Sequence, residues 1–165
     1  MTTTVLPKVL LGVSLIAALV TTAAPSHAEA PKSCHVTKVV EFEQKEGKPQ
    51  WESGNRNRFA NGRWSFDSDG TFSYTTTDVR DDIYPLHGKY TVSGDTLRFS
   101  AHGSSVIGAS SSFVELEGKI DLGAKPAKAQ SYVASGAGYG AVVNNQKFGA
   151  TASALYGGTA ELSCS

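Results

Sequence analysis

Two pairs of alternating segments between Trp64 and Phe99 constrain the fold of this chain most strongly. In each pair, large apolar residues occupy every second position on both sides of a turn that contains glycine and aspartate. A period of two is typical of a strand with one buried and one solvated face, and such turns join strands as hairpins. The sequence therefore predicts two β-hairpins. Their segments and turns are residues 64–66, 67–70, 72–76, 88–92, 93–95 and 97–99.

The first 28 residues have the pattern of a secretory signal peptide. Lys8 is the only charged residue before Glu29, residues 9–20 are almost entirely apolar, and Ser26 and Ala28 supply small residues before a cleavage point. A membrane-spanning helix needs about 20 apolar residues, and this run is shorter. We therefore expect cleavage after Ala28, a secreted protein, and no membrane span in the mature chain.

The remaining residues, 29–165, have the length of one domain with one core. Loss of Lys8 with the leader changes the 15 basic and 15 acidic residues of the full chain to 14 and 15. A chain this close to neutrality lacks the basic surface that nucleic acid or an anionic membrane attracts. We expect a single domain, most simply a monomer, that does not bind nucleic acid.

Two cysteines, Cys34 and Cys164, stand near the two ends of the predicted mature chain. In an exported protein two cysteines favour a disulfide, whereas a metal site requires more ligands than a cysteine pair and three scattered histidines offer. In the chain-entropy model, such a bond stabilises the folded chain by at most about 5 kcal/mol. Because the bond brings the first and last strands together, it favours a closed barrel or a sandwich with adjacent edges.

The rest of the chain supplies further strands with weaker patterns. Val36, Val40 and Phe42 are predicted to share the inner face of a first strand, and residues 51–63 are predicted to form an irregular loop. The arginines of this loop either bind a carboxylate or phosphate group or are simply solvated, and the second interpretation is favoured; they are Arg56, Arg58 and Arg63. Aspartates in the segment 78–87 offer either a calcium site or a charged connecting loop, and the spacing favours the loop.

Later strands complete the count. Apolar residues alternate from Val114 to Leu122. The last third, rich in Gly and Ala, is read as three strands near residues 130–135, 139–144 and 152–163, with turns at Gly136 and Asn144-Asn145. The total predicts an all-β fold: a single antiparallel up-and-down barrel of about eight strands with its ends tied by the disulfide.

The order of motifs between residues 62 and 103 resembles small lipocalin-like domains of bacterial exported proteins, which are calycin-type meander barrels. The motifs that carry the resemblance are Trp64-x-Phe66, Asp69-Gly70-Thr-Phe72, Gly88-x-Tyr90-x-Val92 and Gly94-Asp95-x-Leu97-x-Phe99. The resemblance implies an up-and-down barrel with an interior cavity. The sequence lacks an evident C-terminal helix before its last strand, in which it departs from true lipocalins.

No nucleophile elbow, zinc-protease motif, phosphate loop or dinucleotide fingerprint is present in the sequence. The inward aromatic residues of the hairpins either fill the core or line a pocket for a small apolar molecule. The residues predicted to contact such a ligand are Trp64, Tyr74, Tyr84, His87, Tyr90 and Phe99, with Tyr84 or His87 at the mouth. No cofactor or metal is expected.

Two other functions compete with ligand binding. One is an enzyme of the cyclase or isomerase type acting on an apolar substrate, in which His102 or Tyr74 would be required for turnover. The other is a surface protein without catalysis that binds another exported protein. An apolar patch on the outside of the barrel and a filled interior would favour this function.

The mass of the denatured, exported protein tests two of these predictions. We expect a mass that lacks residues 1–28 and lies two hydrogens below that of the reduced chain, because the leader is cleaved and the two cysteines are oxidised. Retention of residues 1–28, or a mass that matches two free thiols, would contradict the respective prediction.

Overall fold

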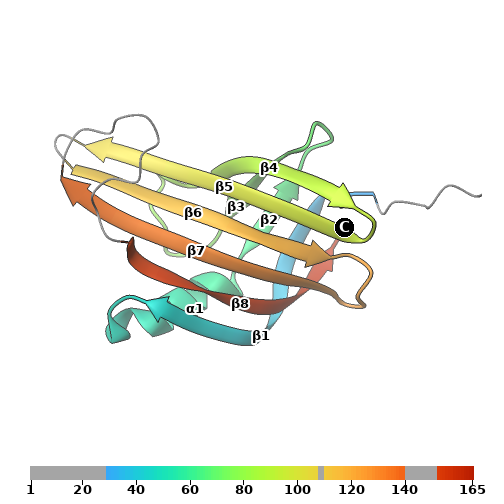
Figure 1. The fold of residues 1–165 in the computed structure, drawn as a ribbon, viewed down its shortest axis with the longest axis horizontal. Helices are drawn as coiled ribbons and strands as arrows, with labels where there is room; N and C mark the ends of the chain where they lie inside the picture. Colours follow the sequence, from blue (N-terminus) through green and yellow to red (C-terminus); the bar gives the residue numbers. More distant parts are fainter. Residues whose placement is uncertain (1–28, 108–109, 140–151) are drawn as a thin grey trace, which may run out of the picture.

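The predicted strands form one closed antiparallel β-barrel in which each strand pairs with its neighbours in the chain and the last pairs with the first (Figure 1). The computed structural model describes residues 29–107, 110–139 and 152–165. The all-β, up-and-down prediction is confirmed. The strands are β1 (Ser33–Glu46), β2 (Arg63–Phe66), β3 (Thr71–Thr75), β4 (Leu86–Ser93), β5 (Thr96–Ile107), β6 (Ser110–Asp121), β7 (Ala127–Tyr139) and β8 (Ala152–Cys164).

Strand β1 does not keep one register along its length. Its pairing with β8 shifts between Val36 and Lys38 and again between Val39 and Glu41, as at β-bulges. Each shift moves the inward position by one residue, so Val39 packs against the core and Val40 is 47% exposed. The prediction that Val40 shares the inner face is wrong, because a pattern of strict alternation ignores bulges.

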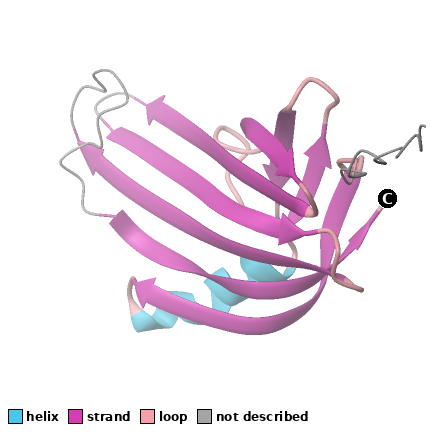
Figure 2. Cartoon of the chain, turned by 45° about the vertical axis from the view of Figure 1, so that its right-hand side comes forward, coloured by secondary structure: helices cyan, strands magenta, loops and turns pink. Residues whose placement is uncertain are grey.

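A helix interrupts the order of strands between β1 and β2. A 3-10 helix, η1 (Pro49–Trp51), leads into an α-helix, α1 (Glu52–Ala60), which occupies most of the segment 51–63 that was predicted as an irregular loop. Figure 2 shows the helix beside β1 and β8, which it contacts. Only Asn55 and Phe59, four positions apart, are buried. One apolar contact is too little to give a helical period in the sequence, which is why the helix was missed.

The last third of the chain contains fewer breaks than predicted. Strand β7 continues through Gly136, where a turn was expected, because Phe113 of β6 lies opposite and its ring covers the glycine. A Cβ at Gly136 would lie 2.4 Å from that ring. The strand near 152–163 corresponds to β8. The turn expected at Asn144-Asn145, and all but the first residue of the strand expected at 139–144, lie outside the described residues.

The first and last strands meet along a long seam. Cys34 and Cys164 face each other in the pairing of β1 with β8 and form the predicted disulfide, with 4.1 Å between their Cα atoms. Beside it, the Lys32 amide donates a hydrogen bond to the Ser165 carbonyl over 2.7 Å. The disulfide prediction is confirmed, and its bond fixes one end of the seam.

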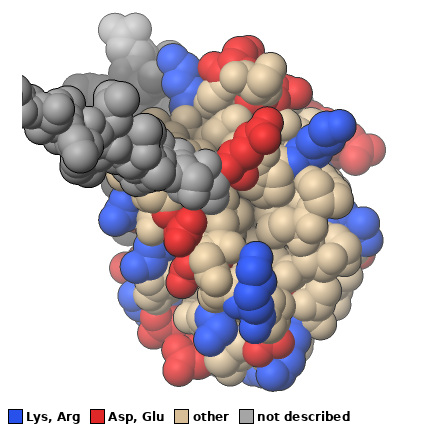
Figure 3. Space-filling view, turned by 90° about the vertical axis from the view of Figure 1, so that its right-hand side faces the viewer, with Lys and Arg blue, Asp and Glu red and all other residues tan. Residues whose placement is uncertain are grey.

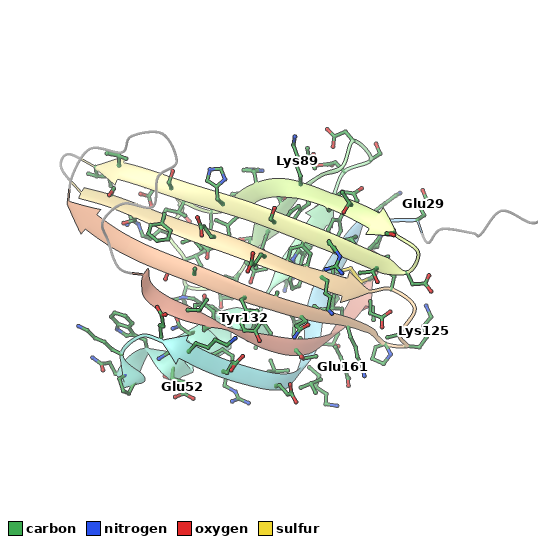
Figure 4. All side chains as sticks on the ribbon, viewed as in Figure 1. Glu29, Glu52, Lys89, Lys125, Tyr132 and Glu161 are labelled. Atoms are coloured by element: carbon green, nitrogen blue, oxygen red, sulfur yellow. A yellow bond between two sulfur atoms is a disulfide. The ribbon has the colours of Figure 1, made fainter. Side chains whose placement is uncertain are left out.

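Farther along the seam, β8 approaches β1 through glycine. Gly158 has a φ of 150°, and a Cβ there would lie 2.1 Å from the Glu41 carbonyl oxygen. The Tyr132 hydroxyl, from β7, reaches across to donate a 2.7 Å hydrogen bond to the Glu43 carboxylate on β1 (Figure 4). The outer surface of the seam is thus held by a side chain that passes over Gly157 of β8, which pairs with Tyr132 on one side and with Glu43 on the other.

The predicted signal peptide, residues 1–28, lies outside the described residues. Neither helix in the described part of the chain has the length and apolar character needed to cross a membrane.

Gly158→Ala tests whether the close approach at the seam is required. We expect a loss of about 3 kcal/mol in the free energy of unfolding, because the new methyl group meets backbone and the φ is strained. Urea unfolding followed by circular dichroism measures this loss.

Gly54→Ala is the matched control. A Cβ at Gly54 meets nothing within 4 Å, and the residue lies in α1, where alanine is favoured by about 1 kcal/mol. An equal effect of the two substitutions would show that the seam tolerates a side chain.

Candidate functional site

The interior of the barrel has two unlike ends. We call the end that carries Cys34 and Cys164 the disulfide end, and the opposite end, which carries α1, the helix end. At the disulfide end, the ring of Phe66 lies 5.8 Å from that of Phe72 and 5.1 Å from that of Tyr90. These rings pack against one another at the distances of aromatic pairs, so side chains fill this end of the barrel.

Trp64 faces Cys34 across the β1–β2 pair, and its side chain is buried in the barrel at 2% exposure. Its ring centroid is 5.1 Å from that of Tyr74 and 5.9 Å from that of Phe99. The indole Nε1 of Trp64 is buried and makes no hydrogen bond within the described structure. An unpaired buried donor costs about 1–3 kcal/mol, so the lack of a partner at this atom needs an explanation.

Three tyrosines come together at the helix end. Tyr74 belongs to β3, Tyr84 to the loop between β3 and β4 (residues 76–85), and Tyr156 to β8. Burial raises the pKa of Tyr74 well above its usual value and the pKa of Tyr156 to about 12. The pKa of Tyr84 is raised too, first by burial and then by Tyr156. The three phenols are thus close enough to interact and are held neutral.

Arg58 places a positive charge near two of these phenols, Tyr84 and Tyr156. Its charge lowers the pKa values of both Tyr84 and Tyr156, opposing the effect of burial. Its Nε donates to the Asp78 carbonyl over 3.2 Å, and its Nη1 donates to the Asn55 side chain over 3.0 Å. The Arg58 carbonyl in turn accepts a hydrogen bond from the Thr76 hydroxyl. Helix α1 and the β3–β4 loop therefore hold this guanidinium in place together.

The β3–β4 loop folds over the inner face of β5 and β6 at the helix end. Arg80 and Asp82 form an ion pair, Arg80 donates to the Ser112 hydroxyl over 3.0 Å, and Asp82 accepts from the Ser105 hydroxyl. Hydrogen bonds from Arg80 and then Ser105 lower the pKa of Asp82 to about 2. Exposed ion pairs of this kind are individually weak, so the loop is fastened by contacts that can open.

The apolar contact of this loop is made by Ile83, which is buried against β5. A Cβ at Gly103 would lie 2.5 Å from the Ile83 carbonyl oxygen and 2.7 Å from a methyl group of Leu86. Within the described residues, no group of three His, Cys, Asp or Glu side chains is placed to hold a metal ion, including the aspartates of this loop. The loop thus serves as a cover.

Apart from Tyr156, much of the β5–β8 wall toward the helix end is made of small side chains. The inward positions of β5 to β8 toward the helix end carry glycine, serine, alanine and valine, in contrast to the phenylalanines of the disulfide end. These residues are Gly103, Ser105, Ser112, Val114, Val133, Ser135 and Ala154. The tyrosines and these small groups together give the helix end a mixed apolar and hydroxyl-bearing lining.

The structure brings together some of the predicted ligand-binding residues and separates others. Trp64, Tyr74 and Phe99 are buried in one aromatic cluster. Tyr84 approaches this cluster from the β3–β4 loop. Tyr90 lies at the disulfide end, where its hydroxyl donates to the Asp67 carbonyl over 2.7 Å. Its position is that of a core residue.

His87 and His102 lie on the outside of the barrel. His87 is exposed on β4, opposite His102 of β5, which is exposed as well. His87 therefore does not join the mouth of the predicted pocket. Because His102 faces out and Tyr74 faces in, they do not belong to a common site, as an enzyme that used both would need.

Sequence reasoning missed Tyr156 at the helix end and did not favour a functional role for Arg58. Arg58 was assigned to a solvated loop, since the helix that aims it was not recognised. Tyr156 lies in a Gly- and Ala-rich segment, and its inward position follows only from the pairing of β8 with β1 and β7. Its place in an alternating series, Ala154, Tyr156, Gly158, Ala160 and Leu162, was the available signal.

Comparison of the chain with models of protein families, with curated proteins and with solved structures finds no match.

Because its buried phenols have raised pKa values, we expect the folded protein to lose stability at alkaline pH. Since the pKa of Tyr156 is raised to about 12 in the folded protein, its contribution to stability is present below pH 10 and is lost as the pH rises toward 12. Tyr156→Phe should reduce the fall in the free energy of unfolding between pH 9 and pH 11 by about 1 kcal/mol. Urea unfolding at both pH values measures the difference.

The comparison at pH 8, where the phenol is neutral in both folded and unfolded chains, isolates the cost of losing the hydroxyl itself. A variant with the same decline as the wild type from pH 9 to pH 11 would show that Tyr156 ionises normally.

Proposed function

We propose that this protein is a secreted, lipocalin-like barrel that binds a small and mainly apolar molecule at its helix end. The observation that carries the proposal is the unpaired Trp64 Nε1, a buried donor inside an aromatic cluster. A carbonyl, ether or hydroxyl oxygen of a ligand would supply the acceptor that the protein itself does not. The rest of the ligand would contact apolar surface.

The surroundings of Trp64 support the same ligand chemistry. Tyr74, Tyr84 and Tyr156 combine apolar ring faces with hydroxyl groups, which suits a pocket that orients an apolar molecule by a few polar contacts. Small side chains of β5 to β8 share this end of the barrel with the rings. The ligand would lie between them, near Trp64 and away from the filled disulfide end.

The β3–β4 loop supports a route of entry. It covers the helix end through two exposed side chains, Arg80 and Asp82, and through Ile83. Opening the loop would break weak contacts and leave the strand pairings of the barrel intact. The disulfide between β1 and β8 favours an oxidising compartment, in agreement with secretion.

Binding of the ketone β-ionone tests the role of Trp64. We expect Trp64→Phe to weaken binding about fivefold, because one hydrogen bond between neutral groups contributes about 1 kcal/mol. Isothermal titration calorimetry of the wild type and the variant measures this change. The hydrocarbon analogue of β-ionone, which lacks the carbonyl, should bind both proteins equally.

Trp51→Phe is the matched control, since Trp51 is exposed on the outside, in η1. It should leave the affinity unchanged and make Trp64 the only tryptophan, so that ligand binding quenches its fluorescence. A failure of β-ionone and of a series of apolar dyes to bind any of these proteins would overturn the proposal and assign the aromatic cluster to the core alone.

A further inference from the structure

A second concave surface lies on the outside of the barrel, on the wall that carries Trp64 of the proposed ligand site. It is a depression of about 240 Å³ where β1, β2 and β3 lie side by side. The outward side chains around it are polar. Its lining residues are Ser33, Cys34, His35, Arg63, Trp64, Ser65, Ser73 and Thr75.

The pairing of the strands sets hydrogen-bond donors next to one another in this depression. His35 faces Arg63 across the β1–β2 pair, and Arg63 faces Thr75 across the β2–β3 pair. Ser65 and Ser73 form the neighbouring pair. An imidazole, a guanidinium and three hydroxyl groups therefore point outward from positions that are adjacent in the sheet.

Arg63 has no counter-ion within the described structure. None of the ion pairs or side-chain hydrogen bonds among the described residues uses its guanidinium. Strands β2, β3, β4 and β5 contain no aspartate or glutamate at all. On the other side of His35, the nearest carboxylate along β8 is Glu161, and it is paired with Lys38 over 3.1 Å. No carboxylate side chain of the described residues lines the depression, so the side chains that line it carry a net positive charge from Arg63.

We infer that this depression binds a phosphate or sulfate group. A guanidinium forms charge-assisted, bidentate hydrogen bonds with such an oxyanion, and the imidazole and hydroxyl groups add further donors. The volume of the depression equals that of about eight waters in the liquid. That is room for the anion together with a group of the size of one sugar ring.

The charge distribution favours a small anionic ligand over a long polyanion. A long polyanion is attracted by an extended surface of one sign. On the face shown in Figure 3, Lys and Arg side chains are interspersed with Asp and Glu. The single unpaired Arg63 in a polar depression matches a single anionic group.

Nuclear magnetic resonance titration of the isotope-labelled protein with glucose 6-phosphate tests the inference. We expect saturable shifts of the Arg63 Nε–Hε and His35 ring signals. Arg63→Gln should weaken binding tenfold or more, as expected for loss of hydrogen bonds to a charged group. His35→Gln should weaken it several-fold. Glucose 6-sulfate should bind in the same place.

Arg98→Gln is the matched control, because Arg98 is an exposed arginine on the outer face of β5, opposite Lys119 and away from the depression. It should bind as the wild type does. Inorganic phosphate and glucose, titrated separately, identify the source of the anion: equal binding of inorganic phosphate supports a site for the free ion, and weaker binding supports a site for the sugar ester.

Three outcomes would overturn the inference. They are the absence of saturable shifts up to 50 mM glucose 6-phosphate, equal affinities of the Arg63→Gln variant and the wild type, and binding of glucose as tight as that of its phosphate. None of these outcomes depends on whether β-ionone enters the barrel.

Discussion

The pairing of β1 with β8 is the contact on which the remaining structure depends, because it turns a sheet of eight strands into a closed barrel. Three features act on this seam: the disulfide at one end, the glycine approach at Gly158, and the hydrogen bond from Tyr132 to Glu43. Without the seam, β1 and β8 would be edge strands with unpaired backbone groups. The aromatic cluster would then lose the wall that keeps water out.

The sequence was most informative where one local pattern decided the structure. Alternation between Trp64 and Phe99 predicted β2 to β5 because these strands are regular and joined mainly by short turns. It failed for Val40, since two bulges in β1 are set by the pairing with β8. It failed for Gly136 as well, because the glycine accommodates a ring from the neighbouring strand. A glycine inside a strand can therefore mark a close contact with a neighbouring strand, as at Gly136, and need not mark a turn.

In the candidate site, too, residues in regular strands were predicted correctly and residues brought together by the closed barrel were not. Trp64, Tyr74 and Phe99 were found because residues with the same parity in paired strands face the same side. Arg58 and Tyr156 are 98 positions apart and meet Tyr84 only after the barrel has closed and α1 has docked. No local pattern contains that information. His87 and His102 were considered because imidazole can act in binding or catalysis. Their odd or even position in the alternation of β4 and β5 was the better guide, because it places both on the outer face.

The hydrogen bond between the Lys32 amide and the Ser165 carbonyl has a consequence for the connectivity of the chain. Residues 32 and 165 are close enough for a short peptide to join them, and the exposed turn at Gly94 is a suitable place for new termini. In such a circular permutant the same eight strands would pair in the same order. The disulfide, which now spans 130 residues, would close only a short loop, so its entropic contribution would fall from about 5 to at most about 3 kcal/mol. The stabilising effect of this bond therefore belongs to the order in which the strands are connected, as well as to their arrangement in space.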